Sequence, residues 1–406
     1  MIRGWKESTT AGVSHPEGFR TSATRAGLKA TGDDVALIAS DQPAAVAGTF
    51  TRNLVQASCV LYSRTIARSG RAQAIVVNAG NANACNGGQG DRDTLMMADV
   101  AGECLEVDPR LVLVASTGVI GQPLPMALVT KGIRQAAGHL TRGARADQRT
   151  AKAIMTTDLR PKQIAVTYRS TAHAGEVRIG GVCKGSGMIA PNMATMLCFI
   201  TTDALVAPEH LQQALSQAVD VTFNRVTVDG DTSTNDMCLA LANGVSGVEI
   251  APGEPLDDFA AALKRVCRYL AREVARDGEG ATKLIEVTVR GASAQETADR
   301  MARVIAESPL VKTAMFGCDP NWGRILAAAG RAGVPFEPEC AEVLLGDICV
   351  YRRGLGAPFD AGAATEYLRS REIAITLNLN SGVHECTVWT CDFSFDYVRI
   401  NAEYHT

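Results

Sequence analysis

Short apolar runs of strand length recur along this chain, with helical patterns between them. The clearest helical pattern covers residues 256–276, where apolar side chains from Phe259 to Val274 recur every three or four positions and Lys and Arg lie between them. Strands and helices therefore mix throughout, which predicts an α/β or α+β fold. The runs that favour strands are residues 35–39, 74–78, 111–115, 177–182, 284–289, 341–350, 373–379 and 387–391.

Two shorter helices are also indicated. Residues 294–307 are expected to be helical, because Ser293 and Glu296 have the spacing of a capping box and Pro309 stands just beyond the end. Another helix is expected at 208–219, and residues 168–176 are typical of a hairpin loop.

Composition limits the class of protein. A chain of 406 residues can form two or three domains or one large layered unit. With 46% hydrophobic residues, 20% charged residues and a net charge of −3, it resembles an ordinary soluble globular protein, and we expect no nucleic-acid partner. We find no signal-peptide core and no long apolar run, so a cytoplasmic location without membrane contact is expected. The 12 cysteines lack a Cys-x-x-Cys pair, which predicts reduced, mostly buried thiols and no metal site.

A glycine-rich loop followed by a threonine carries the strongest chemical signal. The segment KGSGMIAPNMATMLCFITTDA at 184–204 places Thr195 directly after the small residue Ala194. If the bond between them were cut, Thr195 would carry a hydroxyl and an α-amine, whose ordinary pKa of about 7.7–8.0 lets it act as the base. Taken alone, the segment also fits a turn that leads into a buried strand. A dinucleotide-binding loop fits poorly, because Pro191 and Asn192 interrupt the helix that such a loop requires.

The same segment resembles the self-cleavage and nucleophile motif of the ornithine acetyltransferases of arginine biosynthesis, also called glutamate N-acetyltransferases. Other blocks similar to this family follow in the family's order over nearly the whole chain. They are TFTRN (49–53), NAGNANACNG (78–87), ASTGVIG (115–121), AIMTTDLRPK (153–162), DGDTSTND (229–236), DGEGATKLIEV (277–287), SPLVKTAMFGCDPNWGR (308–324) and YVRINAEYHT (397–406).

The resemblance implies a layered α-β-β-α sandwich of the N-terminal-nucleophile-like type, self-cleaved between Ala194 and Thr195. Residues 1–194 and 195–406 would fold together as one unit and assemble as a heterotetramer with two copies of each chain. The implied reaction moves an acetyl group from N2-acetylornithine to glutamate through an acetylated Thr195, without a cofactor. Some members are bifunctional and also use acetyl-CoA; both types share these motifs, so acetyl-CoA stays open as a co-substrate.

The resemblance also assigns the site residues. Thr195 would be the nucleophile, and Thr117 and Gly118 would form the oxyanion hole, for which a hydroxyl and a glycine amide after a strand are chemically suited. A cation such as Lys184 is suited to bind the α-carboxylate of a substrate, and an acid such as Glu279 is suited to bind a substrate amine. The implied substrate-binding residues are Thr156, Lys184, Thr195, Glu279, Asn401 and Thr406.

The C-terminal tail must fold back into the cleft if Thr406 is to contact substrate, since chain ends are ordinarily frayed. Aromatic and branched side chains in the tail could hold it there. These are Tyr397, Val398, Ile400 and Tyr404.

Other arrangements fit less well. Asp229, Asp231 and Asp236 resemble a cation loop, but an EF-hand would need glycine and glutamate where Thr234 and Ala240 stand, so turn-forming hydrogen bonds are expected instead. Of the six histidines, only His405 lies in a matched block. This scarcity suits a mechanism whose base is an amine. Two other function classes stay open: a self-processing peptidase or amidase with an N-terminal nucleophile, and an uncut ligand-binding protein.

Overall fold

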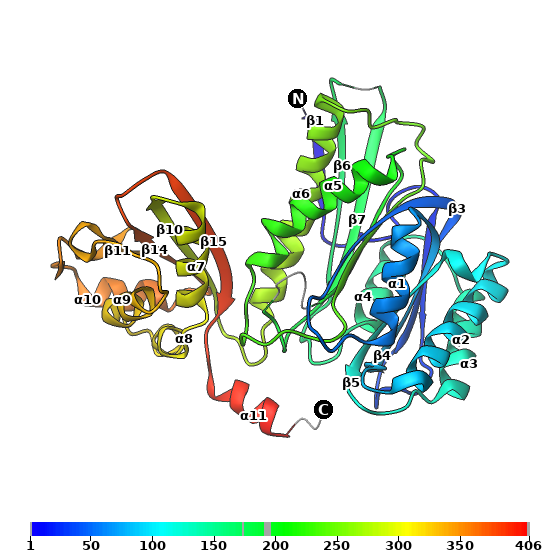
Figure 1. Ribbon diagram of the computed structural model, residues 1–406, viewed down its shortest axis with the longest axis horizontal. Helices are drawn as coiled ribbons and strands as arrows, with labels where there is room; N and C mark the ends of the chain where they lie inside the picture. Colours follow the sequence, from blue (N-terminus) through cyan, green and yellow to red (C-terminus); the bar gives the residue numbers. More distant parts are fainter. Residues whose placement is uncertain (1, 173, 191–195, 404–406) are drawn as a thin grey trace.

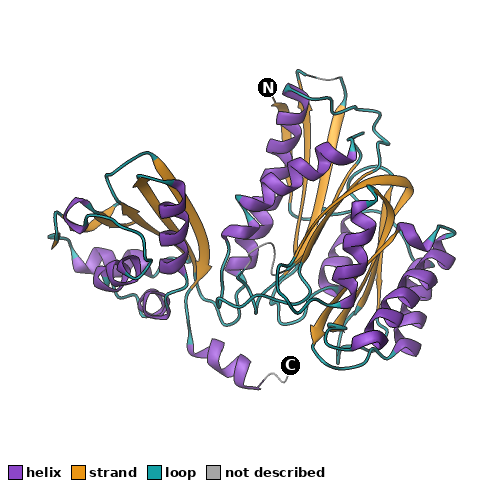
Figure 2. Cartoon of the chain, viewed as in Figure 1, coloured by secondary structure: helices purple, strands orange, loops and turns teal. Residues whose placement is uncertain are grey.

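The structure, a computed structural model, describes residues 2–172, 174–190 and 196–403. This part of the chain forms two bodies, each built on one β-sheet with helices packed against it (Figures 1 and 2). The predicted mixture of strands and helices is therefore confirmed. Three of the predicted site residues, Ala194, Thr195 and Thr406, lie outside the described residues.

The larger sheet is formed by β1 (Ile2–Ser8), β2 (Phe19–Thr24), β3 (Val35–Phe50), β4 (Arg71–Asn81), β5 (Val112–Val119), β6 (Lys162–Ser170), β7 (Glu176–Lys184), β8 (Leu197–Thr202) and β9 (Met237–Ala242). Their order is β1-β6-β7-β8-β9-β3-β4-β5, and β2 pairs with β3. The long strand β3 belongs to both halves of this sheet. Its first part pairs with β2 and β4 and its last part with β9, with a register shift between Ala39 and Ala44.

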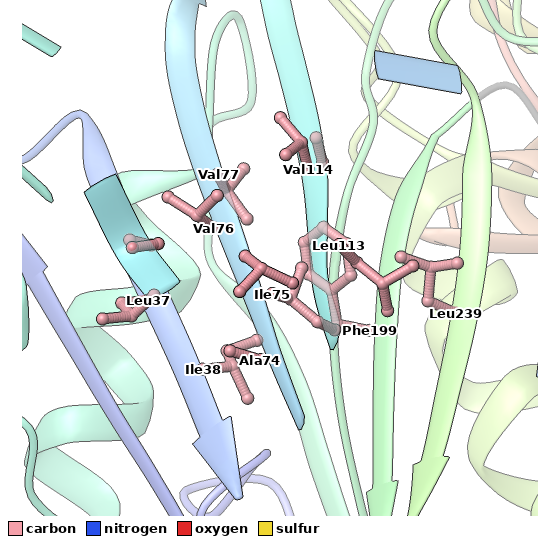
Figure 3. Close-up of a cluster of buried hydrophobic side chains, with 14 of the residues drawn as sticks. Leu37, Ile38, Ala74, Ile75, Val76, Val77, Leu113, Val114, Phe199 and Leu239 are labelled. Atoms are coloured by element: carbon pink, nitrogen blue, oxygen red, sulfur yellow. The ribbon is translucent and has the colours of Figure 1, made fainter. Parts of the chain in front are cut away.

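The two halves of the larger sheet pack on each other, with helices outside. Phe199 of β8 shares a core cluster with Ile75 of β4 and Leu113 of β5 (Figure 3). The next residue, Ile200, points to the opposite face and packs with α5 (Pro208–Asp220) and α6 (Glu254–Arg276). The β2–β5 half is covered by α1 (Ser58–Arg68), α2 (Gly87–Leu105), α3 (Met126–Ala137) and α4 (Ala144–Ala153). The layers are helix, strand, strand and helix, as predicted.

The smaller sheet contains β10 (Leu284–Ala292), β11 (Glu342–Leu345), β12 (Ile348–Arg352), β13 (Leu355–Gly356), β14 (Glu372–Asn378) and β15 (His384–Cys391), in the order β13-β12-β11-β14-β10-β15. Its core is shared with α7 (Gln295–Ala306), α8 (Pro309–Phe316), α9 (Trp322–Gly330) and α10 (Ala361–Leu368). The two bodies meet at α6. Leu284 and Trp389 join the core cluster of α6, and Arg276 pairs with Glu372 over 2.7 Å.

The last helix, α11 (Phe395–Glu403), follows β15 and runs back beneath the larger body (Figure 1). It carries the C-terminal tail towards the loops at one end of the larger sheet. Among the helices of the described ranges, none has the length and hydropathy needed to cross a membrane.

Most predicted elements are present, with two corrections. The helices expected at 208–219, 256–276 and 294–307 are α5, α6 and α7. The single run expected at 341–350 is instead the hairpin β11–β12, because Gly346 takes a left-handed φ of +59° and reverses the chain. The predicted capping box is wrong, since α7 begins after Ala294 and Ser293 is therefore one position too early to cap it. All 12 cysteines are free thiols, as predicted.

Candidate active site

A cavity of about 110 Å³ lies where the loops of the larger sheet meet α11. All six predicted site residues within the described ranges line it, although they come from five separate segments of the chain. They are Thr117, Gly118, Thr156, Lys184, Glu279 and Asn401. The other lining residues are Ala82, Ile120, Thr157, Gly187, Met188, Ser233, Thr234 and Asn235.

The predicted oxyanion pair lies at the end of β5, beside the parallel strand β4. Gly118 takes a φ of +130°, and a Cβ at this position would lie 2.3 Å from the carbonyl carbon of Gly80. Only glycine therefore fits here, because any side chain would meet both backbone strain and a clash. The backbones of the glycine-rich blocks NAGN and STG therefore pass very close to each other at this edge of the sheet.

Lys184, at the end of β7, provides a buried cation inside the cavity. Its Nζ donates to the hydroxyl of Thr156 over 2.8 Å and to that of Thr117 over 3.4 Å. Among the described residues, the nearest carboxylate oxygen to this Nζ is Oδ2 of Asp158, at 4.0 Å. The ammonium group thus lies between two of the predicted hydroxyls, and none of the described carboxylates forms a tighter ion pair with it.

A buried charge network lies behind Lys184. The Nζ of Lys162 is 2.6 Å from Asp158 and 2.6 Å from Asp277, and all three side chains are fully buried. Burial alone would raise the pKa of Asp158, but the charges of Lys162 and Lys184 outweigh it and hold that pKa well below its ordinary value. The amide of Gly185 also donates to Asp158 over 2.7 Å. This network therefore fixes the start of the glycine-rich loop.

Glu279 and Asn401 close the other side of the cavity. The Nδ2 of Asn401 donates to Oε2 of Glu279 over 2.9 Å. The Glu279 carboxylate packs directly on Gly187, where a Cβ would lie 2.3 Å from Oε1. The carboxylate of Glu279 is thus held by the glycine-rich loop and by α11 together.

The way in which α11 reaches the cavity differs from the prediction. No side chain of α11 is buried, and Val398 is 67% exposed. Tyr397 stacks on Phe393 at 4.6 Å, and its amide nitrogen lies close to Gly280. The tail is therefore held by local stacking and by Asn401, whereas the apolar packing expected from Val398 is absent.

The DGDTSTND block contributes contacts that the sequence reasoning missed. The Nδ2 of Asn235 donates to the carbonyls of Ala82 and Ser116, over 2.6 and 2.9 Å, and so ties the ends of β4 and β5 to the cavity. Asp229 accepts from the amide of Asp231 over 3.1 Å, which confirms the predicted turn-forming hydrogen bond. It also accepts from the amides of Met188 and Ile189, over 2.6 and 2.8 Å, and so holds the glycine-rich loop. In the sequence, the only sign that Asn235 belongs to the site was its position in the matched block DGDTSTND.

Asp236, the last residue of this block, is a buried acid beside the cavity. Together with Met196, Ser233 and Asn235 it lines a smaller space of about 30 Å³ next to Lys184. Burial raises the pKa of Asp236 well above its ordinary value, and this effect exceeds the opposing hydrogen bonds from Ser233 and Met196. The folded protein therefore favours the protonated form of Asp236 more than the unfolded chain does.

Comparisons with known proteins identify the family. The ArgJ family model matches residues 20–406. The arginine biosynthesis bifunctional protein ArgJ of Symbiobacterium thermophilum is 50% identical over 405 residues, covering 98% of this chain and 100% of that protein. Its namesake from Thermosynechococcus vestitus is 48% identical over 421 residues, covering 99% of each. A crystal structure of argJ from Bacillus halodurans is 44% identical, with a TM-score of 0.49, over 51% of this chain and 98% of that one.

The family model and the two ArgJ proteins match nearly the full length of the chain, and these matches agree with the family resemblance of the sequence blocks. The relatives define the chain as an acetyltransferase of amino-acid biosynthesis. The chain belongs to the ArgJ family and is an enzyme of arginine biosynthesis.

Proposed function

We propose that this enzyme moves an acetyl group from N2-acetylornithine to glutamate through an acetyl ester on Thr195. The observation that carries the proposal is the meeting of six family-assigned residues in one cavity. Two residues close to segment 191–195 in the sequence support it further, because Met188, three positions before it, and Met196, directly after it, both line the small space beside Lys184. Thr195 itself is assigned from its motif.

The first half-reaction uses the hydroxyl of Thr195 as nucleophile and its α-amine as base. The hydroxyl attacks the acetyl carbonyl, and its proton passes to the amine. Thr117 and the amide of Gly118 stabilise the tetrahedral oxyanion, and such a donor is typically worth about 2.7–4 kcal/mol. The carbon–nitrogen bond then breaks, ornithine leaves with the proton, and the amine of glutamate attacks the ester by the reverse route.

Substrate binding divides between the two sides of the cavity. Lys184 and Thr156 suit the α-carboxylate, because a buried ammonium and a hydroxyl both donate hydrogen bonds to an anion. Glu279 suits the side-chain ammonium of ornithine, with Asn401 holding the carboxylate in place. Thr406 is proposed as a further substrate contact at the end of the tail.

Self-cleavage between Ala194 and Thr195 generates the nucleophile. The resulting chains, 1–194 and 195–406, would stay together, because strands β7 and β8 come from opposite sides of the cut and pair from Ile179–Thr202 to Lys184–Leu197. We further propose that two copies of each chain assemble as a heterotetramer in the cytoplasm.

Acetyl-CoA is proposed as a second acetyl donor, since the close relatives are named bifunctional. In that reaction the thioester carbon–sulfur bond breaks and the carbon–oxygen bond to Thr195 forms. The hydroxyl proton leaves on the sulfur of coenzyme A, and glutamate then takes the acetyl group.

The competing function is that of a self-processing amidase, in which water accepts the acetyl group. Ornithine release from N-acetylornithine, measured with and without glutamate, separates the two. Release that depends on glutamate supports the transferase, and release that is unaffected by glutamate supports the amidase.

A further inference from the structure

A groove rich in arginine lies outside the catalytic cavity, along α1 and against the start of α5. It has a volume of about 930 Å³, and the last residues of β3 form part of its wall. Three cations line it, namely Arg52, Arg64 and Arg68, and Glu209 is the only acid among its lining residues. We call this the arginine groove. Residues 49–52 of the block TFTRN line it, and none of them lines the catalytic cavity.

The three arginines have no ion-pair partner among the residues that the structure describes. Within the described part of the chain, the ion pairs found include none that involves Arg52, Arg64 or Arg68. Arg64 is instead held by neutral groups, since it donates to Gln56 over 3.0 Å and lies 5.4 Å from the ring of Phe50. Burial and the charge of Arg68 both lower the pKa of Arg64. Cations that repel one another in a groove are typical of a site that binds an anion.

The arginine groove reaches the wall of the catalytic cavity. The hydroxyl of Thr51, which lines the groove, donates to the carbonyl of Ser233 over 2.9 Å, and Ser233 lines the cavity. The amide of Ala57, at the start of α1, donates to the carbonyl of Thr234 over 3.0 Å. Segment 233–234, which lines the cavity, is therefore bonded directly to the segment that leads from the groove into α1. From there the groove passes Gln56 and reaches the C-terminal part of α1, where Arg64, Ala67 and Arg68 line it.

A ligand that fits this geometry has several phosphates at one end and a long neutral arm at the other. We propose that the arginine groove binds the phosphorylated nucleotide of coenzyme A, so that the acetylated arm extends from the groove towards the catalytic cavity. This inference rests on acetyl-CoA being a donor for the enzyme, as proposed above. Arg52 and Arg68 would contact the phosphates, and Arg64 with Phe50 would form the inner wall.

The test is a calorimetric titration of the full protein with coenzyme A. The double variant Arg52→Glu/Arg68→Glu changes two exposed residues and leaves Arg64 in place. We expect it to weaken coenzyme A binding at least about tenfold, because two cations that attract phosphate become anions that repel it. The matched control is Arg145→Glu, an exposed arginine at the start of α4 and outside the groove, which should bind as the wild type does. Dephospho-coenzyme A and inorganic phosphate, titrated separately, report which phosphates are recognised.

Glutamate-dependent ornithine release is measured on the same variants and should be unchanged, because that reaction needs no nucleotide. Unaltered coenzyme A binding in the double variant, an equal loss in Arg145→Glu, or no binding by the wild type would overturn the inference. Failure of ornithine release in the wild type would instead contradict the proposed function. The titration measures coenzyme A binding alone and therefore distinguishes a failure of this inference from a failure of the proposed function.

Discussion

Asn401 of the C-terminal helix donates a hydrogen bond to Glu279 over 2.9 Å, joining residues that are 122 positions apart. This contact connects the tail to the loop that follows α6. Because α11 buries no side chain, the contact is the most specific link between the described tail and the cavity.

Deletion of residues 401–406 is therefore expected to raise the KM for N-acetylornithine about tenfold, since Glu279 loses a partner that orients it. Self-cleavage should proceed as in the wild type, because the deletion removes no residue of the cleavage motif at 184–204. Steady-state kinetics and a denaturing gel measure the two effects. Unchanged KM values would remove Asn401 and Thr406 from the site.

Lys184→Met is expected to lower kcat/KM roughly 100-fold, because it removes a charged donor from the cavity. The matched control is Lys152→Met, which changes an exposed lysine on α4 and should keep full activity. Circular dichroism of both variants checks that they fold. If Lys184→Met kept wild-type kcat/KM, the buried ammonium would have no part in binding or turnover.

Lys162→Met is expected to destabilise the protein by about 3–5 kcal/mol, since it leaves two buried carboxylates, Asp158 and Asp277, without their shared cation. Because the pKa of Asp158 is lowered on folding, its stabilising effect is present above the ordinary aspartate pKa and is lost as the pH falls towards the folded value. Denaturant unfolding at neutral pH measures the loss. Lys264→Met, at an exposed position of α6, is the control and should change stability little.

Asp236→Asn is expected to be more stable than the wild type at pH 8 and close to it at pH 4. The pKa of Asp236 is raised on folding, so the folded protein takes up a proton, and stability falls as the pH rises from the unfolded pKa through the folded one. The slope reaches about 1.4 kcal/mol per pH unit for one proton. Unfolding curves across this range test it, with Asp91→Asn on the exposed surface of α2 as the reference. A constant difference at every pH would refute the raised pKa.

The local patterns of the chain predict its local structure well. The helix α6 was visible because its apolar residues keep a regular spacing, whereas the hairpin at Gly346 was missed because both of its strands are apolar and only the φ of one residue divides them. The matched blocks predict six candidate site residues within the described ranges, and these residues line one cavity. The contacts that hold the site in place could not be predicted from the sequence. For example, Lys162 and Asp277 form an ion pair but are 115 positions apart, and no spacing rule connects them. The raised pKa of Asp236 could not be predicted either, because burial causes it and the burial of this side chain follows only from the packing of the strands.

The intact mass of the purified, active protein, before and after incubation with N-acetylornithine in the absence of glutamate, tests the central claim most directly. We predict two chains, 1–194 and 195–406, and a gain of one acetyl group on the second chain that fragmentation assigns to Thr195. Thr195→Ala should remain a single chain without activity. A single uncut chain in active wild-type protein, or an acetyl group on any other residue, would contradict the account.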